Sequence, residues 1–384
     1  MTETPPAAPS GRIVHEVVWS DAFSWWILFK AAGQAFAPTV LILATLGSLA
    51  TWAGLSLADS LGIPAAVELP AEAVASEAAT TGAEADFFSP SGVVLPSLPG
   101  LIDRLPTPVA DLLYLMVTPW NPLATTVEFL GSLARIFWFI LVWSIFATAI
   151  VRHVALRLVD EELPGFRCAL GFGCRKWLAS FNSAVFVFVG LIALALPGAG
   201  LGLLMRFDWG LAVAGAIWPL VLLGAVVLAV LAIGLAAGWP LMVSAVGVER
   251  GDSFQAISTG FSYLYQRPIH FAFYSLISCL VALLAFFAAG LFADATMNLA
   301  VLATSFGMGH SRTANVVAAV TSGGNDPRWG VQALQFWTDG LRTMLAAFGW
   351  GYFWAIAPAI YLLLRQDVDA TELDEIVLEE PGEA

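Results

Sequence analysis

The segment that decides the fold is ERGDSFQAISTGFSYLYQRP, residues 249–268, which separates two long apolar runs. Its large apolar residues recur at helical spacing, at Phe254, Ile257, Phe261 and Leu264, and polar residues fill most of the other positions. This period is typical of an amphipathic helix. The segment is too short and too polar on one side to cross a bilayer, so we expect it to lie flat at a membrane surface.

The ends of this helix carry their own signals. Asp252 or Ser253 can accept hydrogen bonds from the first free backbone N–H groups. Arg267-Pro268 ends the helix, because proline disfavours helix at the residue before it and suits the first turn of the next one. The pattern therefore predicts a surface helix followed at once by a membrane span.

The composition of the whole chain places this segment in a membrane protein. Hydrophobic residues make up 59% of the sequence and charged residues 12%, with a mean hydropathy of +0.82. Soluble domains are about half apolar and about one quarter charged. The net charge of -13 and the absence of a basic patch make nucleic acid an unexpected partner, and the lipid bilayer is the expected one.

Six stretches with few or no charged residues are long enough to cross a bilayer core of about 30 Å. They are residues 31–57, 129–151, 177–205, 211–237, 271–291 and 343–364. We expect Pro240 to break the fourth helix, because proline removes a backbone donor. The predicted fold class is therefore an all-α integral membrane protein with six transmembrane helices.

A threefold repeat is predicted within this membrane domain. Residues 20–36 and 164–181 precede spans in the same way as residues 249–268, so each unit has an interfacial helix and two spans. Chance similarity among amphipathic segments is the alternative, since residue identities hardly repeat.

The distribution of Lys and Arg predicts that both termini lie in the cytoplasm. Residues 1–19 then form an N-terminal tail, 20–364 the membrane domain and 365–384 an acidic tail. The long outer loops fall near 59–125 and 294–340. Tryptophans near the proposed boundaries, Trp239 among them, are expected at the membrane interfaces.

The stretch PLMVSAVGVERGDSFQAISTGFSYLYQRPIHF, residues 240–271, resembles several bacterial multi-pass membrane-domain families of unknown function. One of them is the membrane domain attached to some glycerophosphodiester phosphodiesterases. The matching positions are Glu249, Asp252, Ala256, Gly260, Phe261, Arg267 and Pro268. The resemblance covers about 30 residues well and implies a helical domain in a bacterial-type inner membrane. No phosphodiesterase catalytic domain accompanies it.

The sequence contains no recognised catalytic, cofactor or metal-binding motif, so we expect no enzymatic activity. Arg135 is the best single functional candidate, because a charge within a span usually faces a cavity or a partner. Glu128 lies seven residues earlier and would share its face. The competing interpretation is that Arg135 only extends toward the outer headgroups.

Three functional hypotheses follow from this sequence, and the third, a membrane enzyme acting on lipid substrates, would require a polar cluster at one interface. The first is a non-enzymatic membrane protein that organises a complex with other membrane subunits or handles lipid, using glycine-rich faces such as Gly198, Gly200 and Gly202. The second is a transporter or channel for a small solute with Arg135 lining the path.

Overall fold

The computed structural model describes residues 23–64, 125–159, 165–321 and 327–371, and within these ranges all regular secondary structure is helical. Six of the helices are long and apolar enough to cross a membrane. The prediction of an all-α, six-span membrane protein is therefore confirmed. The predicted tail at residues 1–19 and most of the first outer loop lie outside the described residues.

Within each described range, the helices follow one another with short connections. In chain order they are η1 (Ser24–Trp26), α2 (Ile27–Gln34), α3 (Pro38–Ser60), α8 (Thr126–Leu158), α9 (Phe166–Leu204), α10 (Asp208–Glu249), α11 (Ser253–Gln266), α12 (Pro268–Met308), α13 (His310–Thr321) and α14 (Trp329–Asp369).

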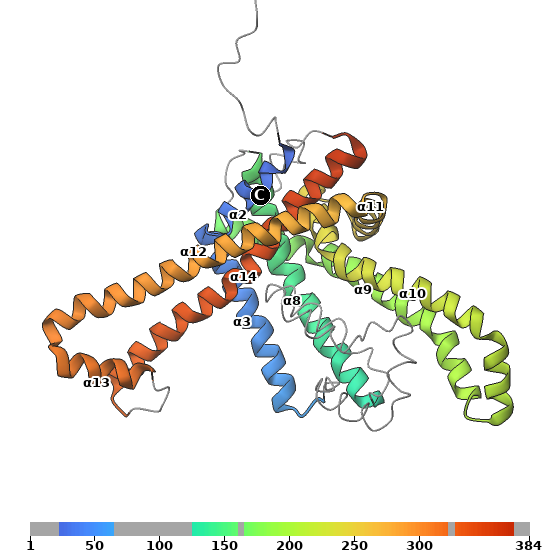
Figure 1. Cartoon of the computed structure of the whole chain (residues 1–384), viewed down its shortest axis with the longest axis horizontal. Coiled ribbons are helices and arrows are strands. Elements are labelled where there is room, and N and C mark those ends of the chain that lie inside the picture. Colours follow the sequence, from blue (N-terminus) through green and yellow to red (C-terminus); the bar gives the residue numbers. More distant parts are fainter. Residues whose placement is uncertain (1–22, 65–124, 160–164, 322–326, 372–384) are drawn as a thin grey trace, which may run out of the picture.

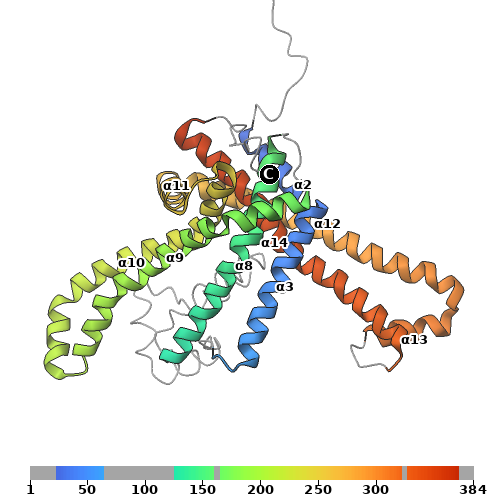
Figure 2. The same cartoon turned by 180° about the vertical axis from the view of Figure 1, so that it is seen from behind.

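The long helices form three hairpins that spread apart from a common region (Figure 1). The first hairpin is α3 with α8, the second α9 with α10, and the third α12 with α14, with α13 at its far end. The second and third point to opposite sides and the first lies between them, as Figure 2 also shows from behind. We call the common region the hub: α2, α11 and the second halves of α8, α10 and α14.

The hub is the packed core of the protein. The buried residues of α10 gather in 234–248 and those of α14 in 347–364, where these helices meet the inner half of α8. Outside the hub most large side chains of α9, α10 and α12 are exposed to the surroundings of the chain. The protein therefore has one core, from which the arms extend nearly uncovered.

Each returning helix contributes one fully buried tryptophan to the centre of the hub. These are Trp143 of α8, Trp239 of α10 and Trp354 of α14. The Trp354 ring centroid lies 5.9 Å from that of Trp143 and 5.3 Å from that of Trp239. Trp239, predicted to lie near the inner membrane boundary, therefore packs its ring against residues of the other two hairpins. The three hairpins thus meet through one tryptophan each.

Several predicted boundaries differ from the observed helices. Pro240 does not break α10, which runs through both Pro219 and Pro240, because packing in the hub holds the helix where the proline removes a backbone bond. The second predicted interfacial helix, residues 164–181, is the first part of α9 rather than a separate element. The second predicted outer loop, at 294–340, is long enough for one or two amphipathic helices, for example around residues 332–341. Most of its described residues are helical, since α12 continues to Met308 and α14 begins at Trp329.

The first and third interfacial helices are separate elements, as predicted. α2 packs its buried side, Ile27, Leu28 and Ala31, into the hub. α11 lies beside α10 and precedes α12 directly. α14 continues to Asp369, past the predicted boundary at residue 365, while residues 372–384 lie outside the described part of the chain.

Candidate functional site

Arg135 joins the far ends of the first hairpin, away from the hub. Its Nη2 lies 2.6 Å from Oδ1 of Asp59, at the end of α3, and donates a hydrogen bond of 3.0 Å to the Ile63 carbonyl. The Arg135 side chain is 14% exposed and that of Asp59 69%. Arg135 therefore ties the chain that leaves α3 to the start of α8.

Glu128 is engaged at the start of its own helix. It forms a capping box at the start of α8, in which the Thr125 N–H donates to Oε2 of Glu128 at 2.7 Å. The Glu128 N–H donates in turn to the Thr125 hydroxyl at 3.3 Å. The carboxylate is thus held by its own helix end, where the helix dipole also favours a negative charge.

The family-like motif at 249–268 builds the corner where α10 turns into α11 and then α12. Asp252 caps α11, since the Gln255 N–H donates to its Oδ1 at 2.8 Å, which confirms one of the two predicted caps. Arg267 ends α11 and directly precedes α12, and Pro268 is the first residue of α12. The three positions fix where each helix begins and ends.

Ala256 and Gly260 are the small residues of the motif, and they let α11 approach α10 closely. Ala256 is buried, and a Cβ atom on Gly260 would lie only 2.8 Å from Cγ of Met242. On the facing helix, Gly234 and Gly238 form a G-x-x-x-G pair, a pattern that favours close helix contact in membranes. The G-x-x-x-G spacing is visible in the sequence and is enough to predict a close helix contact at this point.

Phe261 fills the space over one of these glycines. A Cβ atom on Gly234 would lie 2.2 Å from the Phe261 ring, and Phe261 stacks on Tyr265, whose hydroxyl donates to the Val230 carbonyl. The face of α11 that is buried therefore consists mainly of small residues, together with Tyr263 and Leu264. Phe254, which periodicity assigns to the apolar face, is exposed on the side of α9 and stacks on Phe186.

Glu249 is the centre of a polar cluster at the base of the hub. Its Oε1 accepts a hydrogen bond from the Tyr361 hydroxyl and lies 3.6 Å from Nε of Arg365, both on α14. Its Oε2 accepts a bond of 2.9 Å from the Gln255 amide. The first residue of the motif therefore holds the C-terminal part of α14 against α10 and α11.

Two further tyrosines hold the end of α14 in the same region. The Tyr263 hydroxyl of α11 donates to Asp369, and the Tyr274 hydroxyl of α12 donates to Asp367 at 2.9 Å. Burial, together with the nearby Asp369 carboxylate, raises the pKa of the Tyr263 phenol. Asp367 and Asp369 are thus parts of the folded hub, whereas the sequence analysis assigned them to an acidic tail.

The C-terminus of α10 is covered by cations from two other helices. Nζ of Lys176 donates to the Arg250 carbonyl at 2.8 Å, and Nη1 of Arg152 donates to the Gly247 carbonyl at 3.1 Å. Arg152 also lies over the Phe172 ring. Positive charge is favourable at a helix C-terminus, so these contacts allow the end of α10 to be buried in the hub.

The cluster is suited to holding helices together. The Glu249 carboxylate accepts hydrogen bonds from a phenol and an amide and lies near a guanidinium. Both of its oxygens are therefore engaged by groups of the same chain. Among the described residues, no group of three His, Cys, Asp or Glu side chains could hold a metal ion. Gly198, Gly200 and Gly202 do not pack within the chain, since a Cβ atom at each would meet nothing within 4 Å.

No protein family, curated protein or solved structure matches this chain. The resemblance of residues 240–271 to bacterial membrane-domain families therefore stays a prediction, based on the motif residues alone.

Proposed function

We propose that this chain is a non-enzymatic integral membrane protein that organises a membrane complex or handles lipid. The observation that carries this proposal is the divergence of the three hairpins from a single hub, with apolar side chains exposed along the arms. Arms that diverge within a bilayer leave space between them. Lipid or the helices of another protein must fill that space, because apolar side chains facing water are unfavourable.

The length of α10 supports this arrangement. Residues 209–248 contain no charged side chain, and at about 1.5 Å per residue they are about 60 Å long. A bilayer core is about 30 Å thick. An upright helix would therefore place about half of this apolar stretch in water. A strongly inclined arm keeps it in lipid, as the spread hairpins of Figures 1 and 2 suggest.

The hub supports a non-enzymatic role in a second way. Its polar groups connect α10, α11, α12 and α14 to one another, through Tyr361, Tyr263 and Tyr274 and their carboxylate partners. Such a network fixes the angles between the hairpins. The chain then serves as a frame whose arms keep a set spacing in the membrane.

Extraction of the full chain from its native membrane in polymer-bounded lipid discs, followed by native mass spectrometry, tests the proposal. We expect a lipid class or a second protein to be retained in a fixed ratio. Gly198→Trp should lower this ratio, because the position is open within the chain and lies on an arm. Gly33→Trp, equally open but on α2 in the hub, is the matched control. Random bulk lipid in all three samples would contradict the proposal.

Transport remains the second hypothesis because of one observation. The Nε of Arg135 is buried and has no hydrogen-bond partner among the described residues. Solute flux into proteoliposomes that Arg135→Ala abolishes, but Arg342→Ala leaves unchanged, would favour a transporter. We expect no such difference, because Nη2 of Arg135 is engaged by Asp59 and the Ile63 carbonyl.

We further propose that the hub lies on the cytoplasmic side of a bacterial-type inner membrane, with both termini inside. Exposed arginines gather where α8 and α11 end and where α9 begins, and such enrichment is typical of cytoplasmic loops. They are Arg157, Arg167, Arg175 and Arg267. A reporter that is active only in the cytoplasm should be active when it is fused after Arg365. Activity of an export-dependent reporter at the same position would reverse the orientation.

A further inference from the structure

The far part of the third hairpin has an amphipathic surface that the membrane-spanning requirement does not explain. α12 and α14 are 41 residues each, about 60 Å at about 1.5 Å per residue. About 20 residues suffice to cross a bilayer core. Residues 329–342 of α14 precede the stretch that the sequence predicts as the sixth span.

One face of this part of α14 is aromatic and open. Trp329, Phe336 and Trp337 are 82%, 70% and 73% exposed. They stand at positions i, i+7 and i+8, so they lie on the same side of the helix, with Met344 at i+15. Gly340, at i+11, lies on this face too, and a Cβ atom there would meet nothing within 4 Å.

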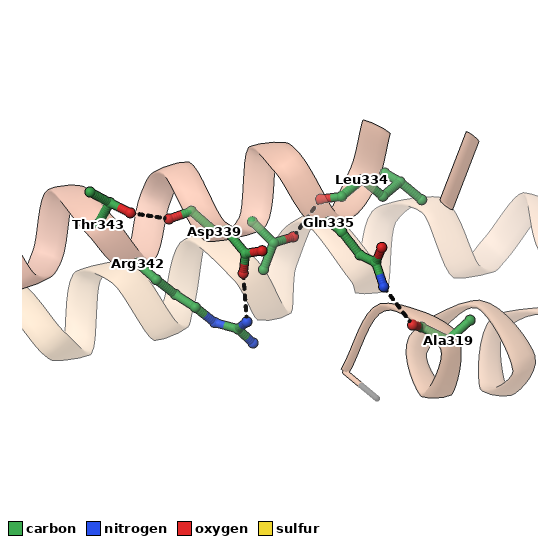
Figure 3. A network of polar contacts seen from close by, with 7 residues as sticks. Ala319, Leu334, Gln335, Asp339, Arg342 and Thr343 are labelled. Carbon is green, nitrogen blue, oxygen red and sulfur yellow. Dashed lines mark hydrogen bonds and ion pairs between the residues drawn. The ribbon is translucent and has the colours of Figure 1, made fainter. Parts of the chain in front are cut away.

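The polar residues of the same segment are satisfied within the chain, as Figure 3 shows. Nη1 of Arg342 lies 2.9 Å from Oδ1 of Asp339, so the two charges compensate each other. The Gln335 amide donates to the Ala319 carbonyl of α13 at 3.0 Å, and the Thr343 hydroxyl donates to the Asp339 carbonyl at 2.7 Å. A segment with paired polar groups and an open aromatic face suits the boundary between lipid headgroups and acyl chains.

The other long helix of the same hairpin carries a second exposed apolar stripe. Leu284, Leu291, Leu299 and Phe306 of α12 recur at intervals of seven and eight residues, and all four are strongly exposed. This stripe begins within the predicted fifth span and continues past it to the far end of the arm. The surface that faces lipid in the span therefore extends without a break into the part that the sequence assigns to an outer loop.

We propose that the far part of this hairpin, residues 292–321 and 327–342, lies along the headgroup region of the leaflet opposite the hub, with Trp329 and Trp337 as its anchors. Tryptophan suits this depth because its ring is apolar and its N–H can reach a polar partner. The partner is the lipid surface itself. This contact is separate from the proposed function, because it needs only the membrane and no retained lipid class or companion protein.

A spin label at position 340 tests this placement. Gly340→Cys keeps all the aromatic residues, and replacement of Cys168, Cys174 and Cys279 by serine leaves one reactive thiol. In vesicles of the full chain, we expect relaxation of the label by oxygen to exceed relaxation by a water-soluble nickel complex. A label at Arg342→Cys, which stands two residues after Gly340 and so points to the opposite, polar side of the same helix, should show the opposite order.

Two results would overturn the inference. Stronger relaxation by nickel than by oxygen at position 340 would place the arm in water. Protection from both reagents would show that protein, such as a second copy of this chain, covers the face. In the Gly340→Cys background, Trp329→Ser with Trp337→Ser should raise accessibility to nickel, and an unchanged ratio would show that these rings are not the anchors.

Discussion

Gly173 and Gly171 lie two residues apart on α9 and should respond oppositely to the same change. A Cβ atom on Gly173 would lie 2.4 Å from the Ile145 carbonyl oxygen and 3.0 Å from Cβ of Ala149, both on α8. At Gly171 it would meet nothing within 4 Å. Gly173→Ala must therefore push the two helices apart, whereas Gly171→Ala needs no adjustment.

The size of the difference follows from two opposing effects. Alanine in place of glycine favours the helix by up to about 1 kcal/mol, and this gain applies to both variants. Overpacking costs about 1–3 kcal/mol and applies to Gly173→Ala alone. Restoring an ordinary contact of 3.4 Å would separate α8 from α9 by about 1 Å locally. We therefore expect Gly173→Ala to be less stable than Gly171→Ala by about 1–3 kcal/mol.

Reversible unfolding in SDS, followed by circular dichroism of the detergent-solubilised full chain, measures this difference. Gly171→Ala is the matched control because it changes the same residue type in the same helix. Equal free energies of unfolding for the two variants, within about 0.5 kcal/mol, would refute the close approach of α8 and α9.

Three other predictions concern the hub. A double-mutant cycle of Glu249→Gln and Tyr361→Phe should give a coupling energy of about 0.5–3 kcal/mol, measured by the same SDS unfolding, and additive effects would contradict the contact. The raised pKa of Tyr263 should make the folded state lose stability as pH rises above the ordinary phenol value of 10.0, because only the unfolded chain then releases the proton. Tyr263→Phe should weaken that loss in alkaline unfolding curves, and an unchanged slope would assign it to other groups. Trp239→Ala should cost about 3–5 kcal/mol and Trp239→Phe less, while equal small losses would show that the ring is not enclosed.

The spans were predictable from the sequence because lipid requires about 20 apolar residues in a row. The helix ends were harder to predict, since hydropathy does not tell where a helix stops once it leaves the lipid. α12 and α14 therefore extend beyond the predicted fifth and sixth spans, into the region where the sequence predicts only short amphipathic helices between them. Pro240 also shows that a local breaker can be overridden where neighbouring helices hold the chain.

The partners of the candidate residues were less predictable than their positions. A spacing of seven places Glu128 and Arg135 on one face of the helix. The Glu128 carboxylate instead accepts a hydrogen bond from the backbone N–H of Thr125, three residues earlier. That capping-box spacing is visible in the sequence. In contrast, Glu249 and Tyr361 are 112 residues apart, and no local pattern connects them.

The burial of α14 has a consequence for the order of assembly. Its second half is the most enclosed of the six candidate spans, and it is translated after the other five. Trp143 and Trp239 cannot meet their common neighbour Trp354 until residue 354 has been translated. The centre of the hub therefore stays incomplete until α14 is inserted, and a chain truncated before α14 should insert but stay open to proteases.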